Sequence, residues 1–161
     1  ECSRSGQGFG VCLILEGSEV GQPALPAAVG CEARIIDFST APDGLLVLSV
    51  QGERRFHVRS SRVRHDGLVV ADVEWYPPPV PHPVHPEHQL LALLLRRMVE
   101  RAGPPFDPVD KSRFDDSDWV AWRLAEWLPL SWPARQSLLG ESDPYARLQC
   151  LVELIPDVQA F

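Results

Sequence analysis

The sequence predicts an α+β fold, with a β-rich first half and a helical second half. Before residue 76 apolar residues alternate with polar ones, whereas after residue 85 they recur at the three- and four-residue spacing of helices. Two hairpin signals, Pro42-Asp43-Gly44 and Asp66-Gly67, divide the first half. Proline-rich residues 77–83 separate the halves, because proline neither donates to a sheet nor extends a helix. We therefore expect a β-rich lobe over residues 1–80 and a helical lobe over 81–161, together forming one unit.

The first half is expected to form an antiparallel meander. Gly17 to Ala28, rich in Gly and Pro, is expected to be a loop, and Gly52 to mark a bulge or bend. In the last strand, every second residue from Val69 to Trp75 shares one face. The expected strands cover residues 9–15, 29–38, 45–50, 55–59 and 68–75.

The second half is expected to form four helices. Gly103-Pro104 ends the first, Asp115 to Asp118 cap the second, Ser131 caps the third and Asp143-Pro144 begins the fourth. The expected helices cover residues 87–101, 115–128, 131–139 and 144–155.

Composition excludes several classes of function. The net charge of −7 disfavours nucleic acid as a partner, and the arginines between residues 54 and 64 alternate with apolar residues, as on the solvent face of a strand. No run approaches the roughly 18 apolar residues that span a membrane, so no membrane partner is expected. The four cysteines form no C-x-x-C pair and are expected to be reduced, cytosolic thiols.

Three histidines in and beside the proline-rich segment are the candidate metal ligands. His82, His85 and His88 stand three residues apart, a spacing that polyproline geometry would align. Prolines prevent an ordinary helix through the set, and Glu87 is the one carboxylate nearby. We therefore expect a linker leading into a helix, with neither a bound metal nor any other cofactor.

A series of short segments runs over nearly the whole length of the chain. They are Phe9-Gly10-Val11, Val29-Gly30, Ala33-Arg34-Ile35-Ile36, Pro42-Asp43-Gly44, Gly52 with Arg54-Arg55-Phe56, Asp66-Gly67-Leu68, Ala71-Asp72-Val73-Glu74, Leu128-Pro129-Leu130, Arg135-Gln136, Leu138-Leu139, Asp143-Pro144 and Arg147-Leu148. In kind and order these segments resemble the N-terminal domain of Lon proteases. Each segment is weak alone, and together they are fairly specific.

The resemblance implies a partly open, PUA-like β-barrel followed by a helical bundle, in a stand-alone bacterial form. The family opens with a Pro-Leu-Phe-Pro-Leu-like strand that this sequence lacks, so we expect one or two barrel strands to precede residue 1. Such a gap would leave an open edge able to pair with a second copy. The sequence has no phosphate-binding Gly-x-x-x-x-Gly-Lys-Ser/Thr loop, and its only lysine, Lys111, lies in a polar segment unsuited to a Ser–Lys dyad.

The resemblance also implies a non-enzymatic role in protein quality control. The expected partners are unfolded polypeptide clients or a protease in the cytoplasm, bound through apolar contacts. A small ligand in the barrel mouth, or a metal on the three histidines, is the alternative. The aromatic side chains expected at or behind the polypeptide contacts are Phe9, Phe56, Trp75, Trp119 and Trp122.

Overall fold

The computed structural model describes residues 8–17, 24–103 and 110–158, with side chains described as far as residue 155. The chain divides into two compact units, Glu1–Pro78 and Pro79–Phe161. The described part of the first is a sheet and that of the second is helical, so the predicted α+β class is confirmed.

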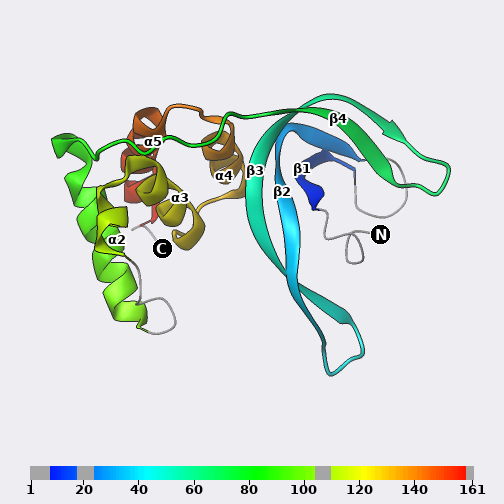
Figure 1. The fold of residues 1–161 in the computed structure, drawn as a ribbon, viewed down its shortest axis with the longest axis horizontal. Coiled ribbons are helices and arrows are strands. Elements are labelled where there is room, and N and C mark those ends of the chain that lie inside the picture. Colours follow the sequence, from blue (N-terminus) through cyan, green and yellow to red (C-terminus); the bar gives the residue numbers. More distant parts are fainter. Residues whose placement is uncertain (1–7, 18–23, 104–109, 159–161) are drawn as a thin grey trace. The chain divides into compact units, whose positions relative to one another are not determined.

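In residues 8–17 and 24–78 the first unit is a four-stranded antiparallel sheet in the order β1-β2-β3-β4 (Figure 1). Tight turns connect the last three strands: Gly44 and Gly67 adopt φ of 85° and 83°, and Asp43 and Asp66 each accept a hydrogen bond from the backbone two residues on. Both predicted hairpins are therefore confirmed. The strands are β1 (Phe9–Glu16), β2 (Leu25–Thr40), β3 (Leu46–Val63) and β4 (Val69–Trp75).

The predicted loop over Gly17 to Ala28 is wrong at its end, and residues 18–23 lie outside the described residues. Strand β2 begins at Leu25, and Pro26 lies opposite Ile14 at the irregular end of the β1 pairing, where a proline is tolerated in a sheet. The bend expected at Gly52 is present as a register shift between the Cys31–Arg55 and Ala33–Gly52 pairs.

Strands β2 and β3 extend beyond the rest of the sheet as a two-stranded ribbon, formed by residues 34–40 and 46–51 (Figure 1). In the described residues neither β1 nor β4 pairs with this ribbon. It carries many exposed apolar side chains, including Phe38 at 67% exposure and Leu46 at 64%.

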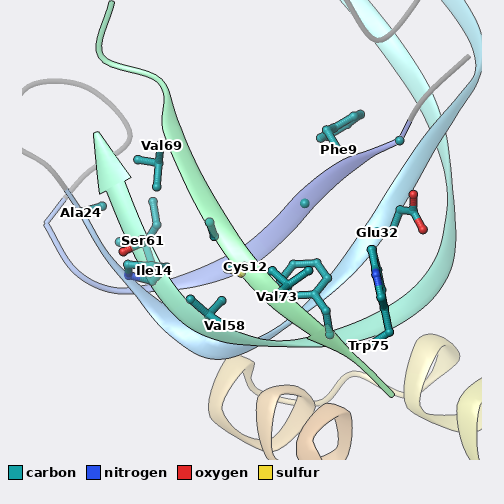
Figure 2. A pocket seen from close by; sticks show the side chains of 15 residues that line it. Phe9, Cys12, Ile14, Ala24, Glu32, Val58, Ser61, Val69, Val73 and Trp75 are labelled. Carbon is teal, nitrogen blue, oxygen red and sulfur yellow. The ribbon is translucent and has the colours of Figure 1, made fainter. Parts of the chain in front are cut away.

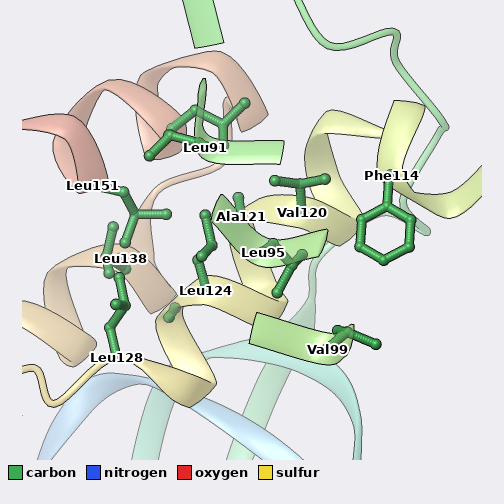
Figure 3. Close-up of a cluster of buried hydrophobic side chains, with 12 residues drawn as sticks. Leu91, Leu95, Val99, Phe114, Val120, Ala121, Leu124, Leu128, Leu138 and Leu151 are labelled. Atoms are coloured by element: carbon green, nitrogen blue, oxygen red, sulfur yellow. The ribbon is translucent and has the colours of Figure 1, made fainter. Parts of the chain in front are cut away.

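The second unit packs its helices around one buried apolar cluster (Figure 3). Val120, Ala121 and Leu124 of α3 are fully buried. Side chains of Asp116 and Ser131 cap α3 and α4. The helices are η1 (Pro86–His88), α2 (Gln89–Ala102), η2 (Lys111–Asp115), α3 (Ser117–Trp127), α4 (Trp132–Gly140) and α5 (Pro144–Val158).

Arg147 is a fully buried charge in this helical unit. Its guanidinium donates to Asp118 Oδ1 at 2.5 Å and to the carbonyl oxygens of Glu141 and Leu138 at 2.5 and 3.3 Å. It also lies 3.9 Å from the centre of the Trp122 ring. Since a buried charge is tolerated only when it is paired and hydrogen-bonded, this side chain joins α3, α4 and α5.

Candidate functional site

An apolar pocket of about 510 Å³ lies in the described part of the sheet unit. Both edge strands contribute to it, β1 through Phe9, Cys12 and Ile14, and β4 through Val69, Ala71, Val73 and Trp75. Figure 2 shows lining side chains from both strands, among them Phe9 and Cys12 of β1 and Val73 of β4. Its volume falls within the roughly 300–1,000 Å³ typical of ligand-binding pockets. The other lining residues are Gly8, Gly10, Ala24, Pro26, Glu32, Phe56, Val58 and Ser61.

Phe56 forms part of the pocket wall from β3. Its side chain is 4% exposed because two glycines make room for the ring. A methyl group at Gly30 would lie 2.5 Å from Phe56 Cζ, and one at Gly10 would lie 3.1 Å from it. Trp75 meets the Phe56 ring edge-on, with centroids 5.9 Å apart and an interplanar angle of 89°. This arrangement holds the Phe56 ring within the wall and leaves Trp75 41% exposed.

The charges around the pocket are already paired. Arg54 Nε lies 3.0 Å from Glu32 Oε2, and the Arg54 guanidinium lies 3.9 Å from the centre of the Trp75 ring. On β4, two of the side chains that alternate with the pocket-facing ones are acidic, and these two, Asp72 and Glu74, make ion pairs with arginines of β3. The pocket surface is therefore mainly apolar, and the acidic side chains between the pocket-facing residues of β4 are paired with arginines.

Cys12 and Cys31 are half-buried, free thiols, and Cys12 lines the pocket. Burial raises the pKa of both thiols above the usual value. A thiol with a raised pKa holds less thiolate at neutral pH and is a poor nucleophile. The environment of Cys12 thus suits an apolar wall better than a catalytic nucleophile.

The structure brings together three of the five aromatic residues proposed from the sequence. Phe9, Phe56 and Trp75 all line the pocket. Trp119 and Trp122 belong to the helical unit, where Trp119 packs edge-on against Phe114 at 5.2 Å and Trp122 stacks on Arg147.

Sequence reasoning did not name the aliphatic wall of the pocket. Alternation along β4 did identify the shared face of Val69, Ala71 and Val73, and that face lines the cavity. The contributions of Cys12, Ile14 and Val58 depend on sheet curvature and pairing, for which a single strand carries no signal.

The three histidines proposed as candidate metal ligands have different surroundings. His85 stacks on Tyr145 with centroids 3.9 Å apart, His82 meets the same ring edge-on, and His88 is buried at 3% exposure. Across residues 8–17, 24–103 and 110–158, no three His, Cys, Asp or Glu side chains are grouped to hold a metal ion. Lys111 is exposed in η2. No helix among the described residues is long and apolar enough to cross a membrane.

Comparison with known proteins identifies the family. Residues 1–157 match the model of the ATP-dependent protease La (LON) substrate-binding domain. The chain belongs to this family. Among curated proteins, none matches it.

Two solved Lon structures are similar to the chain. The Lon N-terminal domain protein from Xanthomonas campestris is 47% identical, with a TM-score of 0.76, over 94% of this chain and 78% of that one. The N-terminal domain of the Mycobacterium avium complex Lon protease is 19% identical, with a TM-score of 0.60, over 94% of this chain and 91% of that one, and supports the fold alone. The predicted resemblance to the Lon N-terminal domain is confirmed, and such a substrate-binding domain is non-catalytic.

Proposed function

We propose that this Lon-type domain binds unfolded polypeptides through their exposed apolar segments and so recognises substrates for ATP-dependent proteolysis. The observation that carries the proposal is an apolar pocket, lined by both outer strands of the described sheet, in a member of the substrate-binding family. Apolar burial would supply the affinity, at about 25 cal/mol per Å² removed from water.

Each aromatic residue has a distinct role in this proposal. Trp75 is the main contact, because it is both exposed and fixed by its neighbours. Phe56 supports it from beneath, and Phe9 forms the wall at the β1 side. For Trp119 and Trp122 we propose a supporting role within the helical unit, since both rings pack against neighbours there.

The proposal places the protein in the cytoplasm, where unfolded clients and a protease partner would be available. The net charge of −7 disfavours nucleic acid as a partner, and the β3 arginines Arg59 and Arg62 are engaged by Glu74 and Asp72.

The test is fluorescence anisotropy of a labelled client that has been reduced and carboxymethylated so that it stays unfolded. Saturable binding that is absent with the same client in its native fold would support the proposal. No binding across several unfolded clients would refute it. Incubation with and without ATP should leave the client intact, because binding rather than cleavage is proposed.

A small apolar ligand in the same pocket is the alternative function that a specific observation favours. The cavity has the volume of a ligand site and is lined mainly by apolar side chains. Native mass spectrometry of the purified protein separates the two functions, since a retained ligand would add a discrete mass.

A further inference from the structure

Residues 82–85 of the proline-rich region, which we call the strap, pair with the start of α3. Pro83 forms an isolated antiparallel bridge with Asp116. Beside this bridge, the Ser117 N–H donates to the carbonyl oxygen of His82 at 2.8 Å. Ser117 is the first residue of α3, so its N–H has no acceptor within the helix. The strap therefore supplies a hydrogen bond that the helix cannot make for itself.

Tyr145 of α5 also holds the strap. Its hydroxyl donates to the carbonyl oxygen of Pro83 at 3.0 Å. Its ring stacks on His85, with ring centroids 3.9 Å apart, and meets the His82 ring edge-on at 6.0 Å. One tyrosine side chain therefore contacts three of the four strap residues, so we expect it to decide how firmly the strap is attached.

The strap is lightly attached compared with the helices. Val84 N donates to Asp115 O at 3.0 Å, and the half-buried Val84 side chain packs against the core cluster. Pro83 and His85 are exposed. His85 has φ −66° and ψ 151°, which is the polyproline II conformation that such a segment adopts without tertiary contacts. Detachment therefore removes few buried contacts and needs little change in backbone conformation.

The segment between the sheet and the strap is short and stiff. Tyr76 belongs to the sheet unit, because its N–H donates to Arg55 O at 3.0 Å and the Arg55 guanidinium lies 4.4 Å from the centre of its ring. Residues 77–81, which follow it, include four prolines. These five residues span about 15 Å in a polyproline II conformation, at about 3.1 Å per residue. Release of the four strap residues would extend the free segment to about 28 Å.

We propose that the strap is a releasable clasp that sets the length of the linker between the two units. When it is attached, the free linker is residues 77–81. When it detaches from Tyr145 and from the start of α3, the free linker becomes residues 77–85, and every helix and strand stays folded. This conformational device goes beyond the proposed function, because it does not depend on what the pocket binds.

Two substitutions in the intact protein loosen the strap and leave the buried core unchanged. Tyr145→Phe removes the hydroxyl bond to Pro83, and His85→Ala removes a stacked ring from a side chain that is 48% exposed. Each should raise the ratio of detached to attached strap about two- to ten-fold, and the double variant should raise it by the product of the two factors. The matched control, Tyr76→Phe, removes a hydroxyl from a ring that Arg55 covers in the sheet unit, and should leave the ratio unchanged.

Nitrogen-15 relaxation dispersion measures the detached population at the Val84 and Ser117 amides, whose hydrogen bonds both break when the strap detaches. The two amides should show one exchange rate, and the interior α3 amide of Leu124 should not share it. A second measurement is the distance between spin labels attached through ketone side chains at the exposed positions Ser49 and Glu153. In the double variant the distance distribution should gain a component up to about 12 Å longer, which is the length of four polyproline II residues.

Several outcomes would overturn the proposal. Different exchange rates at Val84 and Ser117 would mean that their bonds do not break as one unit. Equal detached populations in the double variant and in Tyr76→Phe would mean that Tyr145 and His85 do not hold the strap. Exchange that spreads equally to Leu124 would make the strap part of the helical core. A detached strap without a longer label distance would remove its effect on the linker.

Discussion

Replacing Trp75 with alanine should weaken client binding by about 30- to 70-fold. The side chain is 41% exposed in the free protein. With about 200–250 Å² for a tryptophan, a client that covers the ring removes about 80–100 Å² from water. At about 25 cal/mol per Å², that burial is worth about 2–2.5 kcal/mol, and every 1.4 kcal/mol corresponds to a ten-fold change in Kd.

The assay is anisotropy of the labelled unfolded client titrated with the parent and with Trp75→Ala. The matched control is Trp132→Ala, which removes the same type of side chain from the helical unit, where it is 72% exposed. Thermal unfolding of each variant confirms that it is folded. Unchanged affinity in Trp75→Ala, or an equal loss in Trp132→Ala, would refute the assignment of the pocket as the binding surface.

Three further predictions concern stability. Gly30→Ala should lower the free energy of unfolding by about 1–3 kcal/mol in urea denaturation, because the new methyl would lie 2.5 Å from Cys12 Sγ. The control Gly52→Ala should lower it less, because its methyl would meet Cys31 Sγ at 3.5 Å. Arg147→Met should cost about 3–5 kcal/mol by the same method, since it leaves a carboxylate without its buried partner, and a cost below about 1 kcal/mol would contradict this role. The contribution of the Cys12 and Cys31 thiols to the free energy of unfolding should be fully present below the usual thiol pKa of about 8.5. It should be lost as pH rises through the raised folded pKa values, because the unfolded thiols ionise first. A Cys12→Ser/Cys31→Ser variant should lose this decline in alkaline urea denaturation.

Much of the fold could be predicted because its determinants are local. The turn at Asp66-Gly67 needs a residue at positive φ and a carboxylate that accepts from the backbone two residues on, and both requirements appear as adjacent letters. The start of β2 at Leu25 could not be predicted in this way. Its pairing with Glu16 is a tertiary contact, and proline at the next position disfavours a strand locally.

The candidate site was only partly predictable for a related reason. The shared face of Val69 and Trp75 follows from alternation, but alternation does not reveal whether a face is covered by another layer or left open. Trp119 and Trp75 are both aromatic residues at strand or helix positions, yet one packs edge-on against Phe114 and the other borders a cavity. That distinction depends on which elements lie opposite each ring.

The exposed ribbon of β2 and β3 has a consequence for hydrogen exchange. Phe38 and Leu48 face each other across it, yet they are 67% and 43% exposed, and a two-stranded hairpin alone is at best marginally stable in water. The ribbon amides should therefore exchange through local opening. Amides near Phe56, where β3 has a neighbour on each side, should exchange only when the whole sheet opens. Strand β3 thus carries two local stabilities along one continuous backbone.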